Sequence, residues 1–250
     1  LQWPDEGTVT INTDWEAAGI NQENFDEKMS TASSNMNMRF LTEPLQDDLI
    51  IQGTVRVDFS AALSAGDPAN GYHGVNAHDA DKLTFSIGTS SGKQEDLKLT
   101  LLLCDVCEEE FESISAADPT RNVIPVDVVR EKEFPNGGEL PALDEGEFAL
   151  SSKRYNVITR AYMDLCNPGA GYDPVTASDG IELVKGEYHN YQVFLNATRY
   201  TLAKGHRLAV VIGTEDPVFC LIHKTYSADI QTGSVKAEIP YFGNFSGGLK

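Results

Sequence analysis

Residues 200–212 read YTLAKGHRLAVVI, and this stretch indicates the fold more clearly than any other part of the chain. Gly205 supplies a turn, because glycine adopts backbone conformations that other residues avoid. His206 and Arg207 then lead into the run at 208–212, which is apolar at every position. A strand that is apolar on both faces is normally covered on both faces, so we expect a buried β-strand here.

A two-residue period recurs along the chain and predicts further strands. Residues 49–59 alternate apolar and polar side chains, which is typical of one antiparallel strand with a wet face. Residues 191–195 repeat this pattern, and residues 99–103 break it because they are largely apolar on both faces. No helical pattern of about 10–15 residues alternates with these strands, so βαβ units are excluded. One short helix is expected near residues 21–32, with Asn21 as its N-cap.

These patterns predict an all-β fold, a jelly-roll β-sandwich with long loop insertions and little helix. The loops are rich in glycine, proline, asparagine and aspartate, and they run roughly at 64–81, 108–130, 136–153, 167–179 and 214–218. We expect residues 1–34 to be an irregular N-terminal segment with a short helix, formerly an interdomain connection, and residues 35–250 to form the sandwich. The chain opens with Leu-Gln-Trp-Pro and lacks an initiator methionine, so we expect an internal fragment of a longer protein.

The formal charge of −19 over 250 residues lacks the basic footprint that nucleic acids and anionic membrane surfaces require. Neither nucleic acid nor membrane is therefore expected as a partner, and no apolar run approaches the ~20 residues that span a bilayer. The acidic surface mainly favours solubility. We expect a cytoplasmic protein with four buried or incidental thiols, at Cys104, Cys107, Cys166 and Cys220.

Metal-binding patterns are incomplete in this sequence. Cys104 and Cys107 form a CxxC, but a zinc ribbon needs a second pair at short spacing. Asp67, Asp79 and Asp81 lie in a glycine-rich loop that could offer oxygen ligands to calcium, yet the EF-hand pattern is missing. We expect neither a metal nor a cofactor.

One short motif matches a catalytic pattern. Residues 88–92 read GTSSG, which fits the G-x-S-x-G nucleophile elbow with Ser90 as the nucleophile. The elbow requires a strand-to-helix turn, whereas the leucines within 97–103 follow with strand periodicity. We therefore interpret residues 88–92 as a hairpin loop and expect Ser90 to be non-catalytic.

His206 is the other candidate for catalysis. A general base needs a nucleophile within hydrogen-bond reach and usually an orienting carboxylate. At the start of a strand beside Arg207, the ordinary role of the histidine is a turn-closing hydrogen bond. Gly205, His206 and Arg207 are therefore predicted to be structural residues, and no catalytic residue is expected in the chain.

Three blocks of sequence carry a resemblance to a known family. The first is RFLTEPL with DDLIIQG within residues 39–53, and the second is LLLCDV at 101–106 with YNVITRAYMDL at 155–165. The third is residues 200–212 with a later echo at 226–240. Together they resemble the C-terminal β-sandwich of the Xaa-Pro dipeptidyl-peptidase family, serine hydrolases related to cocaine-esterase-like acyl esterases.

This resemblance implies a galactose-binding-like jelly roll that follows an α/β-hydrolase domain carrying a Ser-Asp-His triad. None of the three blocks matches a catalytic motif of the family. The expected parent is a cytoplasmic bacterial exopeptidase that removes Xaa-Pro dipeptides from peptide N-termini. The expected partners are the catalytic domain of the same chain, peptide substrates through that parent, and a homo-oligomer as a further option. Two alternatives stay open: the accessory domain of an acyl esterase, and a free-standing carbohydrate-binding or adhesion module.

The sequence also suggests where such a domain meets its partner. The outer face of residues 208–212 is apolar, and exposed apolar surface costs about 25 cal/mol for each Å². We therefore expect Ala209 and Val211 to lie under the catalytic domain or under the N-terminal segment of this chain. With Trp3, these residues form the candidate interdomain surface.

Overall fold

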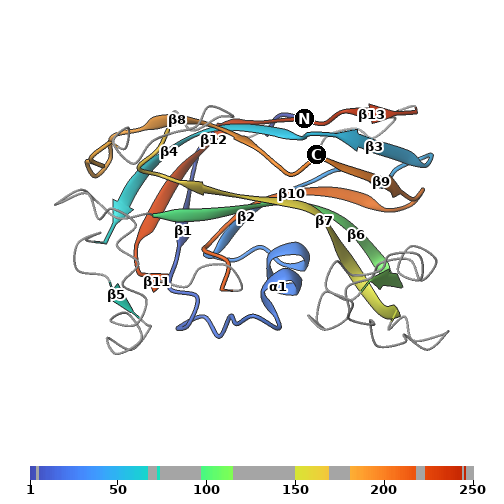
Figure 1. The fold of residues 1–250 in the computed structure, drawn as a ribbon, viewed down its shortest axis with the longest axis horizontal. Helices are drawn as coiled ribbons and strands as arrows, with labels where there is room; N and C mark the ends of the chain where they lie inside the picture. Colours follow the sequence, from blue (N-terminus) through green and yellow to red (C-terminus); the bar gives the residue numbers. More distant parts are fainter. Residues whose placement is uncertain are drawn as a thin grey trace, which may run out of the picture.

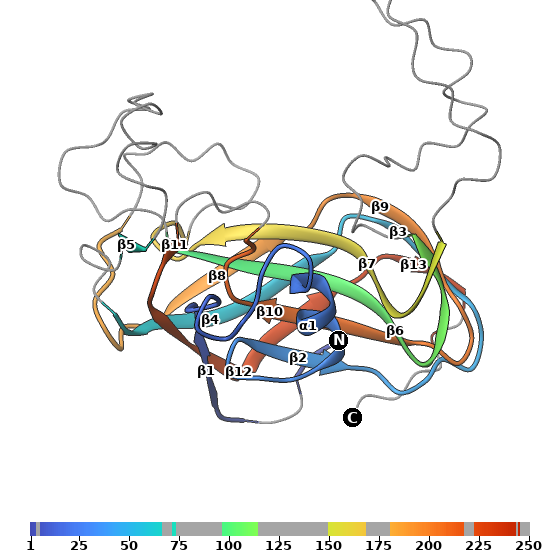
Figure 2. The same cartoon turned by 90° about the horizontal axis from the view of Figure 1, so that it is seen from below.

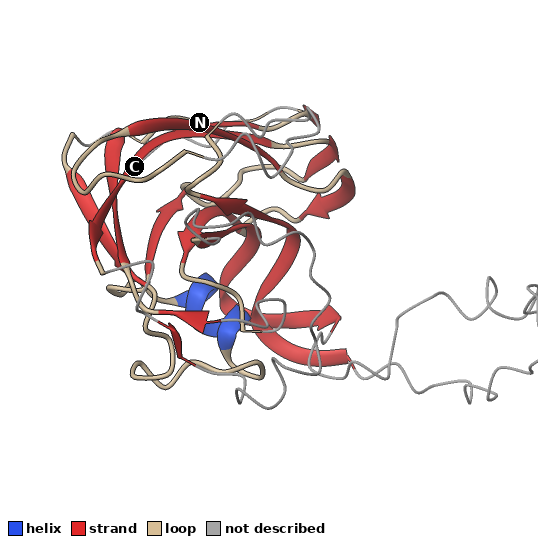
Figure 3. Cartoon of the chain, turned by 60° about the vertical axis from the view of Figure 1, so that its left-hand side comes forward, coloured by secondary structure: helices blue, strands red, loops and turns tan. Residues whose placement is uncertain are grey.

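Two antiparallel β-layers with one short helix on the outside make up the part of the chain that the computed structural model describes (Figure 1, Figure 3). The described residues are 1–3, 6–66, 72–73, 97–114, 150–168, 181–217, 223–243 and 245. The architecture confirms the prediction of an all-β sandwich with little helix. No helix in these residues is both long enough and apolar enough to cross a membrane.

Each four-stranded sheet is antiparallel throughout. The first has the order β1-β12-β4-β8. Its strands are β1 (Thr8–Asn12), β12 (Ser227–Glu238), β4 (Arg56–Ala65) and β8 (His189–Phe194). The second has the order β2-β10-β6-β7 and forms the opposite layer (Figure 1). Its strands are β2 (Asn37–Leu41), β10 (Arg207–Gly213), β6 (Lys98–Ile114) and β7 (Leu150–Asp164).

Two smaller sheets complete the described strands. A three-stranded sheet of order β13-β3-β9 extends the first layer at one end (Figure 1). Its strands are β13 (Tyr241–Phe242), β3 (Leu49–Gly53) and β9 (Thr198–Leu202). A separate pair joins β5 (Tyr72–His73) to β11 (His223–Lys224).

The main hydrophobic core lies between the two layers, because alternate side chains of each strand point inward. Leu101 and Leu103 of β6 meet this core, as do Leu208, Val210 and Ile212 of β10. The period-two pattern of the sequence therefore identified the inward face of the central strands correctly.

A second apolar cluster lies on the outer face of the β2-β10-β6-β7 sheet. Ala209 and Val211 of β10 are fully buried there, against Phe25 and Met29 of α1 (Phe25–Thr31). Seen from below, α1 lies across this sheet (Figure 2). Residues 208–212 are thus covered on both faces, and the N-terminal segment supplies the outer cover.

The N-terminal segment contributes more to the sandwich than one helix. Besides α1 it supplies β1, which pairs with β12 from Thr8↔Gln231 to Asn12↔Ser227. The helix begins later than residue 21, and its N-cap position is Asn24. Asn21 instead makes the preceding turn, in which its side-chain Oδ1 accepts the backbone N–H groups of Glu23 and Asn24. The expectation of Asn21 as the N-cap is therefore wrong by one turn.

The single strand expected at residues 49–59 is divided between two sheets. β3 ends at Gly53, whose φ of 127° lies in a region that glycine favours, and β4 begins at Arg56. A Cβ on Gly53 would also approach Cγ of Pro240 to 3.0 Å. Inward burial nevertheless continues across the break at Val55. The alternation of apolar and polar residues could not reveal the break between β3 and β4, because every second residue remains apolar on both sides of it.

Candidate functional site

A polar cluster centred on Asp105 connects the two layers of the sandwich. Asp105 of β6 is 1 % exposed and lies opposite Leu208 of β10 and Asn156 of β7. Its Oδ2 accepts a hydrogen bond from the Tyr200 hydroxyl at 2.8 Å, and Tyr200 belongs to β9 in the three-stranded sheet. Its Oδ1 lies 2.8 Å from Nδ1 of His206. One buried carboxylate therefore joins strands from both layers.

The turn before β10 fixes the position of His206. Gly205 has a φ of 84°, and the backbone N–H of His206 donates to the Ala203 carbonyl at 3.1 Å, which closes the turn. The His206 carbonyl accepts the N–H of Leu45 at 2.8 Å. The imidazole packs against Phe111, with 4.6 Å between ring centroids. The ring is held by backbone, carboxylate and aromatic contacts together.

Arg207 ties the start of β10 to its neighbours. Its guanidinium donates to the Thr42 carbonyl at 3.1 Å and forms ion pairs with Glu43 at 3.7 Å and Glu108 at 3.6 Å. Glu43 is partly exposed and Glu108 is largely exposed, so these ion pairs position the strand more than they stabilise it. The structure thus places Gly205, His206 and Arg207 in one connected turn.

Burial dominates the electrostatics of this cluster. It raises the pKa of Asp105, while the hydrogen bonds from Tyr200 and His206 oppose that rise. Burial and the neighbouring Asp105 charge also raise the pKa of Tyr200, so its hydroxyl stays a donor. The ionised form of Asp105 is therefore stabilised by the hydrogen bonds from both donors. Through these bonds the cluster holds strands of the two layers together, and we call it the Asp105 clamp.

An imidazole oriented by a buried carboxylate is also the arrangement of a general base. Such a base requires a nucleophile, and in the described part of the chain no serine, threonine or cysteine side chain is hydrogen-bonded to His206. The other catalytic candidate, Ser90, lies outside the described residues. Among the described residues, the geometry therefore supports a role of His206 in positioning the turn.

A second polar cluster holds α1 to the sheet. Arg160 of β7 forms ion pairs at 2.8 Å with Asp26 of α1 and with Asp216, which follows β10. The Tyr162 hydroxyl donates to Asp216 at 3.3 Å. Asp26 is 134 positions from Arg160 in sequence, so no local pattern could have revealed this cluster. In the sequence, this cluster is indicated only by a charged residue, Arg160, within the strand-like block at 155–165.

Among the described residues, no group of three or more histidine, cysteine, aspartate or glutamate side chains is placed so that it could hold a metal ion. Cys104 lies beneath α1 and accepts a hydrogen bond from Ser30 at 3.2 Å. Burial raises the pKa of its thiol to about 12, so it is neutral near pH 7. Cys220 and the carboxylates Asp67, Asp79 and Asp81 lie outside the described residues.

The fold defines a two-layer antiparallel β-sandwich with a helix on its outer face. No protein-family model matches the sequence, and no curated protein matches it. Among solved structures, the chain is similar to an aminopeptidase from the marine sediment archaeon Thaumarchaeota archaeon, with a TM-score of 0.55 and 12 % identity. The match covers 97 % of this chain and 34 % of the aminopeptidase.

Two further solved structures match less well. An α-amino acid ester hydrolase matches with a TM-score of 0.48 and 13 % identity, over 95 % of this chain and 32 % of the hydrolase. A CocE/NonD family hydrolase from Staphylococcus aureus matches with a TM-score of 0.41 and 9 % identity, over 96 % and 37 %. The chain spans about a third of the length of these structures. Of these three structures, the aminopeptidase has a TM-score above 0.5, and at 12 % identity it bears on the fold alone.

Proposed function

We propose that this chain is a non-catalytic accessory domain of a larger hydrolase, and that it packs on an α/β-hydrolase catalytic domain of the same polypeptide. The observation that carries this proposal is the extent of the fold match. It takes in 97 % of this chain but only 34 % of the aminopeptidase, which is what an accessory domain beside a larger remainder would give. His206, without a nucleophile in the described residues, is consistent with a supporting role.

The proposed activity of the whole protein is removal of Xaa-Pro dipeptides from peptide N-termini by a Ser-Asp-His triad on the catalytic domain. Two points support a peptidase: the resemblance of residues 155–165 to the Xaa-Pro dipeptidyl-peptidases, and a fold neighbour that is itself an aminopeptidase. The proposed location is the cytoplasm, in keeping with the free thiols of Cys104 and Cys107.

A substrate panel on the full-length protein tests this proposal. We expect hydrolysis of alanyl-prolyl-p-nitroanilide, with much weaker hydrolysis of p-nitrophenyl acetate and of alanyl-alanyl-p-nitroanilide. The alanyl-alanyl substrate is the matched control, because it differs only at the residue before the cleaved bond. Hydrolysis of short acyl esters alone would favour the esterase alternative. Saturable glycan binding without any hydrolysis would favour a carbohydrate-binding module.

A further inference from the structure

A large bulge interrupts the pairing of the two longest strands, β6 and β7. Regular pairing ends at Val106↔Tyr155 and resumes at Phe111↔Lys153. Residues 107–110 of β6 therefore lie opposite one residue of β7. A bulge bends its strand and changes the local twist. Figure 1 shows β6 and β7 bending away from their layer at this end.

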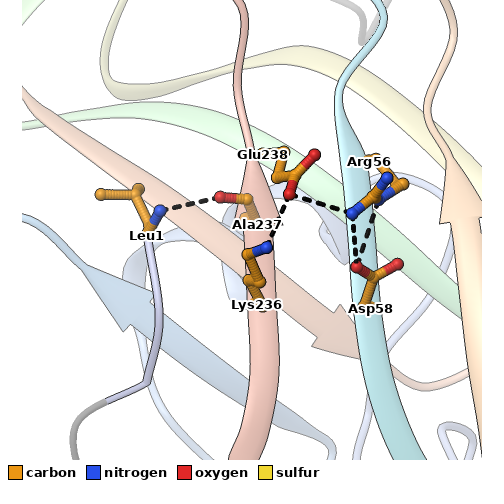
Figure 4. Close-up of polar contacts among 6 residues, drawn as sticks. All are labelled: Leu1, Arg56, Asp58, Lys236, Ala237 and Glu238. Atoms are coloured by element: carbon orange, nitrogen blue, oxygen red, sulfur yellow. Dashed lines mark hydrogen bonds and ion pairs between the residues drawn. The ribbon is translucent and has the colours of Figure 1, made fainter.

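A bulge of the same size in β12 is fixed in the sandwich. Residues 232–235 of β12 lie opposite one residue of β4. Thr232 and Val235 are buried, and backbone groups of both bond the N-terminal segment. Beyond this bulge the N-terminus of Leu1 donates to the Ala237 carbonyl at 2.8 Å, and an ion pair joins β12 to β4 (Figure 4). The β12 bulge is therefore held by burial and by strands on both sides.

The β6 bulge has a different environment, because its side chains lie mostly in water. Cys107 is half-buried, and three successive glutamates, at positions 108–110, are exposed. Glu108 is 89 % exposed and lies 3.6 Å from Arg207, so this ion pair contributes little. A segment with few buried contacts is one that opens or moves locally at low cost in free energy. The β6 bulge thus has the features of a hinge.

Beyond the bulge, residues 111–114 pair with residues 150–153, and we call this short hairpin the β6–β7 arm. A two-stranded hairpin by itself is marginally stable at best in water, so the arm needs support from the sandwich. The main core does not include it, since the core residues of β6 all precede the bulge. A change in the angle of the arm would therefore leave the core intact.

Phe111, the first paired residue of the arm, contacts a fixed part of the sandwich. Its ring lies 4.6 Å from the imidazole of His206, with 45° between the ring planes. The Asp105 clamp and the backbone of the turn hold His206 in place. On the other strand, Lys153 lies over the ring of Tyr155 at 5.3 Å, but a lysine side chain is long and flexible and can follow a change of angle. Of these two contacts, that of Phe111 with His206 is the more rigid.

We propose that the β6–β7 arm changes its angle to the sandwich by bending at residues 107–110, and that the contact of Phe111 with His206 holds it at the angle seen here. Residues 115–149 join the two strands of the arm, so this angle also determines where that segment leaves the sandwich. The turn at Gly205 and His206 thereby positions the arm as well as β10. This inference does not depend on the proposed function.

Hydrogen exchange of the full-length protein, followed by mass spectrometry, tests the hinge. Phe111→Ala removes the ring from the arm, whereas His206→Asn removes the imidazole and keeps a donor for Asp105. Glu108→Gln is the control within the bulge, because its ion pair is exposed. An aromatic contact of this kind is worth up to about tenfold in an equilibrium. We expect amides of the arm to exchange about tenfold faster in F111A and H206N, and within about twofold of wild type in E108Q.

Amides of β10 separate bending of the arm from unfolding of the sandwich. We expect them to exchange at the wild-type rate in all three variants. Equal acceleration of β10 and the arm would show that the arm is an integral part of the sandwich, and would overturn the proposal. Arm exchange at the wild-type rate in F111A and H206N would overturn it too. Acceleration in only one of these two variants would show that the two rings do not hold the arm together, with the same consequence.

Discussion

At the scale of single residues, Asp105 has the most demanding environment, because one carboxylate serves donors from both layers. The sequence placed His206 at a turn and excluded it as a base on context, without any sign of Asp105 as its partner. Asp105 lies 101 positions from His206, and its pairing follows from the β6–β10 register. Spacing rules apply within one element and cannot predict contacts of this kind.

Asp105→Ala should lower the free energy of unfolding by about 2 kcal/mol, since it leaves the Tyr200 and His206 donors without their acceptor. Asp105→Asn is the matched control, because it keeps an acceptor oxygen of similar shape and should cost less. Urea denaturation at pH 7 measures both. An alanine variant as stable as wild type would show that the clamp contributes nothing.

The raised pKa of Asp105 predicts a direction for the pH dependence. The pKa of an aspartate in the unfolded chain is about 3.9, and the pKa of Asp105 in the folded protein is higher. Between these two values the folded state binds more protons, so stability falls as pH rises through the window. As the pH rises from 4, the melting temperature of wild type should therefore fall more than that of Asp105→Asn, which has no carboxyl group at this position. A melting temperature of wild type that rises relative to that of Asp105→Asn over this range would contradict the direction of the shift.

At the scale of elements, β10 shows what alternation can and cannot predict. Five apolar residues in succession predicted that both faces of β10 are buried. In the structure, the main core buries one face and α1 buries the other. The identity of the outer cover depends on the path of the N-terminal segment, which no periodicity encodes. The division of residues 49–59 has the same origin, because Gly53 turns the chain without interrupting the burial pattern.

Met29→Ala should lower the free energy of unfolding by about 3 kcal/mol, because Met29 is fully buried between α1 and β10. Lys28→Ala, at an exposed position of the same helix, should change it by less than about 0.5 kcal/mol. Both are measured by urea denaturation. If the two variants were equally stable, α1 would not be an integral cover of the sheet.

Arg160→Ala should destabilise the protein by about 3 kcal/mol, since it removes the cation shared by Asp26 and the buried Asp216. The double variant with Asp26→Asn shows whether the helix is part of this effect. A coupling energy near zero in that cycle would mean that the ion pair with Asp26 does not contribute to the effect of Arg160.

At the scale of the whole molecule, the sandwich and its resemblance to a hydrolase accessory domain could be inferred from the alternating strands and the blocks at 39–53, 155–165 and 200–212. The association of β3 with β9 and β13 in a separate small sheet could not, because it depends on pairing between segments that are far apart in the sequence.

The proposed role of this chain is to support a catalytic domain without carrying the nucleophile itself. The most direct measurement is labelling of the full-length protein with a fluorophosphonate, followed by peptide mapping of the modified serine. We predict stoichiometric label on a serine outside residues 1–250, and none on Ser90 because an oxyanion hole and an activating base require the strand-to-helix elbow that the leucine pattern at 97–103 excludes. Label on Ser90 that disappears in Ser90→Ala would contradict the account.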